Sequence, residues 1–376
     1  MLIVAGEASA DIHGAGLVRA VQRLDPQVTF QGIGGRRMAR AGVEILIPSS
    51  EMAVVGLVEV LPRLAGIRSA ARRIRRVLHE SPPDLLVLLD YPEFNLHIAR
   101  IANGCGVPVL YYISPQVWAW RRGRVRKIAR RVDRMAVILP FEEPIYRRTG
   151  MPVTYVGHPL LDGLPPGASR EEARRCLGVS RETPLLGVLP GSRNEEVDNL
   201  LAAFLQAAEL LRGVWPGLRC VLPVASTVTR ARIEDRVRSS PVRVDLWRDD
   251  MHRVLPGCDA ALVASGTATL ETAVHHVPMV IAYRVSPLSY RIGKAVIRVP
   301  FIGLVNLVAG RKVVPELIQE EVTPARLARE AARLLAVGPV RENVIKELVR
   351  VQGLLGKGGA SERTAEIALR MMGRAG

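Results

Sequence analysis

Short apolar segments alternate with amphipathic helical segments through both halves of this 376-residue sequence. The apolar segments are 2–5, 28–33, 43–47, 85–89, 107–113 and 135–139 in the first half and 185–189, 220–224, 242–246, 260–264 and 278–283 in the second. Near-continuous apolar strands separated by helices are typical of parallel sheets that are covered on both faces. The sequence therefore predicts an α/β fold with two doubly wound, Rossmann-like domains.

The alternation breaks after Gly157-His158-Pro159, and the segment 164–169 has the Pro and Gly content of a linker. A chain of this length exceeds what one hydrophobic core usually organises. We expect one domain over 1–163 and a second from 164 onward. Ligands of doubly wound sheets bind beyond the carboxyl ends of the strands, so the site is expected in a cleft across which the two domains face each other.

The cysteine, histidine and hydropathy patterns exclude several classes of protein. Four cysteines lie far apart without a CxxC pair, and His158 and His252 are isolated, so we expect neither a disulfide framework nor a metal site. The first residues lack the basic region and cleavage signature of a signal peptide. No apolar run reaches the roughly 18 residues of a transmembrane helix. These features predict a cytoplasmic protein without a metal cofactor.

The net charge of +16 is concentrated in two segments, 63–76 and 121–134, which hold fourteen basic residues and one acid. Such patches indicate an acidic partner, namely nucleic acid, anionic lipid or a phosphorylated substrate, or else a solvated basic face. A helix within 51–79 carries its arginines opposite an apolar stripe and follows an apolar group, a pattern typical of membrane-surface contact. The candidate membrane residues are Val54, Val55, Leu57, Val58, Leu61, Arg68 and Arg72.

Asp90 is the preferred candidate for a general base, because it ends the most apolar strand of the first half and partial burial would raise its pKa. Glu93 and Glu7 are the rival carboxylates, and a helix-capping role for Asp90 is the alternative. Glu7 and Ser9 lie in the small-residue loop after the first strand, where they are candidates to line the cleft and contact a substrate. Gln116 is a third such candidate, in the tryptophan-containing segment 112–120.

Two strand-to-helix turns of the second half suit a phosphate group. Ser265-Gly266-Thr267 opens a helix that carries Glu271 one turn later, and helix N-termini bind anions through free N–H groups. Ser192-Arg193 opens the first helix of this half, where an arginine can pair with a pyrophosphate. Plain helix capping explains either turn by itself. The two turns together favour a nucleotide diphosphate, although neither is a Walker P-loop.

The sequence resembles the lipid-A-disaccharide synthase family of inverting GT-B glycosyltransferases over almost its whole length. The matching segments are Gly6-Glu7-Ala8-Ser9, 112–120, Val156-Gly157-His158-Pro159, 189–193, 265–271 and Asn306-Leu307-Val308-Ala309-Gly310. The family has Gly where this chain has Ala10, which suggests a less tight loop there. The resemblance implies a GT-B fold whose C-terminal helices, about 345–376, return to the first domain, so that the second domain spans 164–344.

The resemblance also implies an activity and a set of site roles. The family transfers 2,3-diacylglucosamine from UDP-2,3-diacylglucosamine to 2,3-diacylglucosamine 1-phosphate, forming a β-1,6 disaccharide and UDP with inversion and without a cofactor. The first domain would bind the acceptor and the cytoplasmic face of the inner membrane, with Asp90 as the base on the acceptor 6-hydroxyl. The second domain would bind UDP-sugar through Ser192, Arg193, Ser265, Gly266, Thr267, Glu271 and Asn306.

Two other functions remain possible from the sequence. Another GT-B reaction, such as UDP-sugar epimerisation or transfer onto undecaprenyl-linked sugars, would use the same nucleotide turns. A nucleic-acid-binding protein would explain the charge, but the basic segments lack a recognised binding motif and interleaved aromatic residues. We therefore expect no nucleic-acid partner. The C-terminal helices make a homodimer by exchange conceivable.

Overall fold

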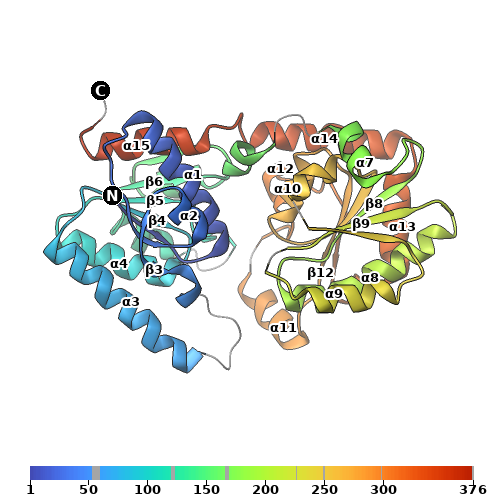
Figure 1. Ribbon diagram of the computed structural model, residues 1–376, viewed down its shortest axis with the longest axis horizontal. Helices are drawn as coiled ribbons and strands as arrows, with labels where there is room; N and C mark the ends of the chain where they lie inside the picture. The colour runs from blue at the N-terminus through green and yellow to red at the C-terminus, as the bar shows by residue number, and fades with distance from the viewer. Residues whose placement is uncertain are drawn as a thin grey trace. The chain divides into compact units, whose positions relative to one another are not determined.

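The computed structural model describes residues 1–52, 60–119, 123–165, 169–225, 227–248, 250–297 and 299–374. These residues form two compact units, 1–162 with 355–376 and 163–354. Each unit is a parallel sheet with helices on both faces (Figure 1). The predicted pair of Rossmann-like α/β domains is thus confirmed.

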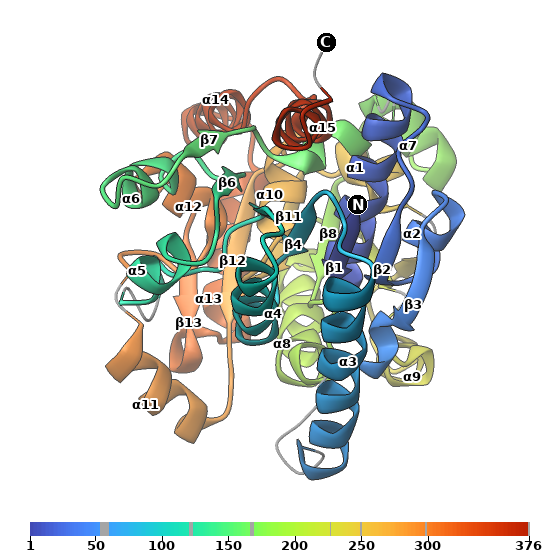
Figure 2. The ribbon, with the colours of Figure 1, turned by 90° about the vertical axis from the view of Figure 1, so that its left-hand side faces the viewer.

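In the first unit, seven described strands pair in the order β3-β2-β1-β4-β5-β6-β7. The strands are β1 (Leu2–Ala5), β2 (Gln31–Gly34), β3 (Glu44–Pro48), β4 (Leu86–Leu89), β5 (Val109–Tyr112), β6 (Arg134–Val137) and β7 (Val153–Tyr155). The helices are α1 (Ala8–Leu24), α2 (Arg36–Arg40), α3 (Val60–Glu80), α4 (Pro92–Gly104), α5 (Arg124–Ala129), α6 (Glu143–Arg147) and α15 (Ala360–Met371). α1 and α15 lie side by side although they are far apart in sequence (Figures 1 and 2).

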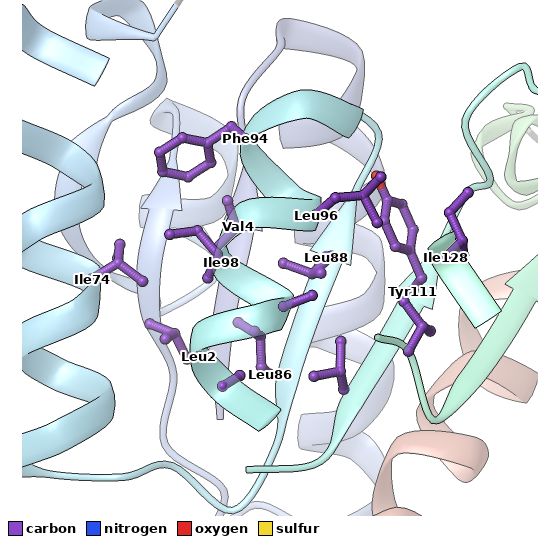
Figure 3. Close-up of a cluster of buried hydrophobic side chains, with 14 of the residues drawn as sticks. Leu2, Val4, Ile74, Leu86, Leu88, Phe94, Leu96, Ile98, Tyr111 and Ile128 are labelled. Carbon is purple, nitrogen blue, oxygen red and sulfur yellow. The ribbon is translucent and has the colours of Figure 1, made fainter. Parts of the chain in front are cut away.

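The core of the first unit lies between its sheet and helices α3 and α4 (Figure 3). Leu2, Leu86 and Leu88 project from the strands onto Ile74 of α3 and Ile98 of α4, and all five side chains are fully buried. Each such side chain contributes about 1.5–3 kcal/mol through removal of apolar area from water. This packing fixes β4, and with it Asp90, in the middle of the sheet.

The second unit has six described strands in the order β10-β9-β8-β11-β12-β13. The strands are β8 (Leu185–Leu189), β9 (Arg219–Pro223), β10 (Val244–Trp247), β11 (Ala260–Ala264), β12 (Met279–Tyr283) and β13 (Glu316–Ile318). The helices are α7 (Arg170–Leu177), α8 (Asn194–Arg212), α9 (Arg230–Arg238), α10 (Ala268–Ala273), α11 (Pro287–Val296), α12 (Leu304–Ala309), α13 (Pro324–Leu335) and α14 (Pro339–Leu354).

The return to the first unit starts later than the sequence suggested. We expected it at about residue 345, but α14 packs against α10, α12 and α13, so the second unit extends to Leu354. From Leu355 onward the chain belongs to the first unit. There the Asp162 carboxylate accepts the N–H groups of Ala360 and Ser361 at 3.0 and 2.8 Å and so caps α15.

Candidate active-site residues

Asp90 and Glu7 follow neighbouring strands of the first sheet. β1 and β4 are parallel, and Ala5 pairs with Leu89, so the residues just beyond these positions leave the same edge of the sheet. Glu7 is the exposed N-cap residue of α1, and Asp90 is half-buried. The fold therefore brings together two of the three carboxylates considered for the base.

The backbone at Asp90 is held in an unusual conformation. Asp90 and Tyr91 have φ values of 47° and 43°, in the left-handed region that non-glycine residues rarely adopt. The Asp90 carbonyl accepts hydrogen bonds from Tyr111 Oη at 2.5 Å and Asn95 Nδ2 at 2.6 Å. Such strain persists only where the surroundings enforce it, and it concentrates at functional sites.

The pKa of Asp90 is raised to about 6. Burial is the largest cause, the negative charge of Glu7 adds to it, and a hydrogen bond from the Tyr91 backbone opposes it. A carboxylate with this pKa is ionised at neutral pH and is a stronger proton acceptor than an ordinary aspartate. Asp90 therefore combines a place at the carboxyl edge of the sheet with the basicity that general base catalysis requires.

Gly6 is required by the tyrosine that follows Asp90. A Cβ at Gly6 would lie 2.9 Å from the Tyr91 ring, closer than van der Waals contact allows. The Tyr91 hydroxyl in turn donates to the Met52 carbonyl at 3.1 Å. The loop after β1 and the loop after β4 are thus packed against each other, which fixes the surroundings of Asp90.

The other carboxylates and polar candidates of the first unit have different surroundings. Glu93 is exposed on the first turn of α4 and pairs with Arg124. Ser9 is exposed on the first turn of α1. Asp11, four residues after Glu7, is buried and accepts the N–H groups of Gly35, Arg37 and Met38 at the start of α2.

Gln116 is exposed in a loop that is anchored on both sides. Before it, Ser114 Oγ lies 2.6 Å from Tyr146 Oη, and after it Trp118 Nε1 donates to the buried Glu142 carboxylate at 3.1 Å. The loop follows β5, the neighbour of β4, and starts at Ile113, whose φ of 68° is also left-handed. Gln116 is therefore presented to solvent at the same edge of the sheet as Asp90.

The two predicted phosphate turns are adjacent in the second unit. Val263 of β11 pairs with Leu189 of β8, so the turns that follow these strands leave the same sheet edge. The Ser265 hydroxyl donates to the Ile302 carbonyl at 2.8 Å and fixes its turn. Thr267 is exposed as the N-cap residue of α10. Among the described residues, no acceptor is paired with the N–H groups of Gly266 and Thr267.

Glu196 occupies the other phosphate turn, which the sequence did not predict. Its carboxylate accepts the N–H groups of Ser192 and Arg193 at 2.9 and 3.2 Å and pairs with Arg193 Nη1 at 2.9 Å. Gly191 has a φ of 120°, and a Cβ there would lie 2.3 Å from Glu196 Oε2. Arg193 remains three-quarters exposed, so its guanidinium is accessible to an anion.

Glu271 is half-buried in α10. Burial, with the negative charge of Asp250 as a smaller cause, raises its pKa to about 7. Nearby on this side of the unit, His252 Nδ1 and His275 Nε2 are 2.8 Å apart, one donating to the other. This pair could not be predicted from the sequence, because its members lie 23 residues apart and neither belongs to a motif.

Asn306 has a structural role in the described chain. Its Nδ2 donates to the Val314 carbonyl and to Glu316, and its Oδ1 accepts the N–H groups of Val313 and Val314. These four bonds are the full capacity of an amide side chain. Asn306 therefore holds the loop before β13. A direct contact between Asn306 and the UDP-sugar would require breaking one of these bonds.

The membrane candidates are only partly described. Val54, Val55, Leu57 and Val58 lie outside the described residues, as does the side chain of Leu61. Arg68 and Arg72 are exposed on α3 and line a groove of about 680 Å³ between α3 and α4. Its other charged or titratable lining residues are Arg75, His79, His97 and Arg100. Within the described ranges, none of the four arginines has a carboxylate partner, so this basic groove is available to anions.

Two further observations concern membrane-spanning helices and metal sites. Among the described residues, no helix is both long and apolar enough to cross a membrane. In the same residues, no three His, Cys, Asp or Glu side chains group as the ligands of a metal ion would.

Comparison with known structures supports the fold. The chain superimposes on the calicheamicin glycosyltransferase CalG4 with a TM-score of 0.64 and 17% identity, over 99% of this chain and 98% of that one. It also superimposes on the UDP-GlcNAc 2-epimerase of Neisseria meningitidis with a TM-score of 0.67 and 12% identity, over 98% and 99%. At these identities the likeness concerns the fold alone, which is GT-B.

Sequence comparison identifies the family. Residues 1–367 match the lipid-A-disaccharide synthetase family. The chain is 51% identical to the lipid-A-disaccharide synthase of Geobacter metallireducens over 374 residues, covering 100% of this chain and 97% of the relative. It is 41% identical to that of Coxiella burnetii over 367 residues, covering 98% and 97%. The chain therefore belongs to the lipid-A-disaccharide synthase family and is a glycosyltransferase.

Proposed function

We propose that this enzyme transfers 2,3-diacylglucosamine from UDP-2,3-diacylglucosamine to the 6-hydroxyl of 2,3-diacylglucosamine 1-phosphate, with Asp90 as the general base. The observation that carries the proposal is Asp90 itself, a carboxylate on a constrained backbone whose pKa of about 6 keeps it ionised and basic at neutral pH. Membership of the lipid-A-disaccharide synthase family supplies the substrate class.

In the proposed reaction, Asp90 accepts the proton of the acceptor hydroxyl as its oxygen attacks the anomeric carbon of the donor. The bond between that carbon and the UDP phosphate oxygen breaks, and UDP leaves with the bonding electrons. A single displacement inverts the anomeric configuration and gives the β-1,6 linkage. Its transition state accumulates negative charge on the leaving diphosphate, so groups that hold this charge lower the barrier.

The second unit would hold the diphosphate. The exposed Arg193 guanidinium is a bidentate donor for phosphate oxygens, and the N–H groups of Gly266 and Thr267 are free to donate in the described chain. Glu196 now occupies the Ser192 and Arg193 N–H groups, so a phosphate that uses them must displace its carboxylate. Glu271 would accept a ribose hydroxyl.

We predict that Arg193→Ala weakens UDP binding by about tenfold to a hundredfold. A charge-assisted hydrogen bond contributes about 1.5–3 kcal/mol, and each 1.4 kcal/mol changes an affinity tenfold. Isothermal titration calorimetry with UDP measures the change. The matched control is Arg238→Ala, because Arg238 also forms an exposed i,i+3 ion pair in this unit. Equal UDP affinity in Arg193→Ala and the wild type would remove Arg193 from the donor site.

We predict that kcat/KM rises with pH up to about 6 and is flat just above, because Asp90 must be ionised to accept a proton.

Glu7→Gln removes a like charge, so it should lower the pKa of Asp90 and move this rise in kcat/KM to lower pH. Since burial is the larger cause, the midpoint of this rise in kcat/KM should stay above the ordinary pKa of an aspartate. Identical pH profiles for the wild type and Glu7→Gln would contradict this coupling.

The acceptor and donor are both acylated, so the enzyme must reach lipid. We propose that it binds the anionic cytoplasmic surface of the inner membrane peripherally. The basic groove between α3 and α4 supports this proposal, because basic side chains near an anionic surface each contribute about 1 kcal/mol. A homodimer formed by exchange of the C-terminal helices stays a prediction from the sequence.

Incubation with both lipids tests the proposed reaction. The expected products are UDP and a tetraacyl disaccharide phosphate, detected by mass spectrometry. The absence of disaccharide with donors of several acyl lengths would overturn the proposal. Recovery of an epimerised donor without acceptor would instead favour an epimerase, a class with the same fold.

A further inference from the structure

Helix α11 (Pro287–Val296) carries an apolar edge that the second unit does not cover. Leu288, Ile292 and Val296 recur at four-residue spacing and are 69%, 59% and 45% exposed, and Ile297 follows at 42%. The helix has no buried residue. In a helix this spacing aligns side chains on one stripe, here about 12 Å long at 1.5 Å per residue. Three large apolar side chains are thus exposed on one stripe, and a fourth, Ile297, is exposed directly after the helix.

Basic side chains flank this stripe. Arg291 and Lys294 are exposed on the helix, and their positions place them together along one side of the line through Leu288, Ile292 and Val296. The sequence from Arg284 to Pro300 contains no acid and also includes Arg298. The opposite side of α11 faces the unit through half-buried Tyr290 and Gly293. The apolar stripe of α11 therefore faces solvent, and the cations lie beside it.

The position of α11 relates it to the donor side of the unit. It follows β12 by three residues, so it stands at the carboxyl edge of the sheet, as do the Ser192–Arg193 and Ser265–Thr267 turns. In both ribbon views it projects away from the body of the second unit (Figures 1 and 2). The sequence pattern indicated membrane contact only in the first half of the chain and did not predict this helix.

We propose that α11 is a membrane-contact element of the second unit, which inserts Leu288, Ile292 and Val296 into the interfacial region of an anionic bilayer. An exposed apolar stripe beside cations is the pattern of helices that lie in the plane of the interface. The net positive charge selects an anionic lipid surface over a neutral one. This inference extends the proposed peripheral location and gives the donor-binding unit its own access to lipid.

Vesicle co-sedimentation with two matched double variants tests the inference. Leu288→Glu with Ile292→Glu should weaken binding to vesicles of phosphatidylglycerol and phosphatidylethanolamine at least tenfold. Val337→Glu with Val340→Glu is the control, because these residues of the same unit are 87% and 46% exposed but lie outside α11. Wild-type binding by the α11 variant, or equal losses in both variants, would overturn the inference. So would equal wild-type binding to pure phosphatidylcholine vesicles.

A second variant and a second readout separate this inference from folding and from the proposed reaction. Arg291→Ala with Lys294→Ala changes only exposed side chains, so it should retain UDP affinity while binding anionic vesicles several-fold more weakly. Unchanged vesicle binding would contradict the role of the cations. If the wild type makes no disaccharide but the α11 variants still lose vesicle binding, the proposed reaction fails and the membrane role of α11 stands.

Discussion

Replacing Asp90 with Asn is expected to lower the transfer rate by about 100-fold or more while UDP affinity stays at the wild-type value. The amide cannot accept the proton of the acceptor hydroxyl, whereas the residues proposed to bind UDP belong to the other unit. Asn is the appropriate substitute because it tolerates the left-handed backbone found at this position, where φ is 47°. The fold and the Asp90 carbonyl contacts should therefore survive the change.

Steady-state kinetics of disaccharide formation measures this effect, with UDP calorimetry as the check on folding. Glu93→Gln is the control, because Glu93 is exposed three residues away and pairs with Arg124. It should keep near wild-type turnover. Unchanged turnover in Asp90→Asn would contradict the assignment and transfer the base role to Glu93 or Glu7, the carboxylates that the sequence left as rivals.

Replacing Asp259 with Ala is expected to lower the unfolding free energy of the second unit by about 3–5 kcal/mol. This buried carboxylate pairs with Arg170, Arg174 and Arg341 at 2.5, 2.7 and 3.2 Å and accepts the Leu185 N–H at 2.8 Å. Arg174 is itself only 4% exposed. Removing the carboxylate leaves buried positive charge without compensation, which costs more than a surface ion pair contributes.

Urea denaturation followed by tryptophan fluorescence measures the loss. Asp235→Ala, which removes an exposed ion pair with Arg238, is the control and should change stability by less than about 1 kcal/mol. Burial alone would raise the pKa of Asp259, but the Leu185 N–H and Arg170 outweigh it and lower the pKa. The stabilisation should therefore be present at neutral pH and be lost as the pH falls through this lowered pKa. Equal urea midpoints for both variants would contradict the account.

Buried strands were the most predictable elements of the fold. β11 has the predicted bounds, 260–264, because a short continuous apolar run between turn residues typically forms a buried strand. β7 and β13 were missed, since each is a three-residue strand at the edge of its sheet without an apolar run. α11 was missed as well, because its apolar stripe faces outward and local sequence does not show which side a fold leaves uncovered.

The location of the candidate site followed from the sequence, but its contacts did not. A carboxylate that ends a central apolar strand must lie at the carboxyl edge of the sheet, so Asp90 could be placed. Burial, the largest cause of its raised pKa, could be expected from the sequence, but the added effect of Glu7 depends on the register of β1 and β4, which pairs residues more than 80 positions apart. Glu196 carries no motif that indicates its contacts, yet its carboxylate binds the N–H groups of the phosphate turn itself.

Asn306 shows a second limit of motif-based assignment. The family motif placed it near the donor, whereas its amide binds Val313, Val314 and Glu316. A motif marks a position as constrained but does not say whether a ligand or the fold imposes the constraint. Only the path of the loop before β13 reveals these partners.

The configuration of the new glycosidic bond tests the central claim most directly. The proposed reaction is one displacement, in which Asp90 deprotonates the acceptor and no covalent sugar–enzyme intermediate forms. NMR of the disaccharide made from the α-linked UDP donor should show a β-linked anomeric proton, with one UDP released per linkage. An α-linked product would require two displacements or a different geometry of attack, and it would contradict the assignment of Asp90 as the sole base.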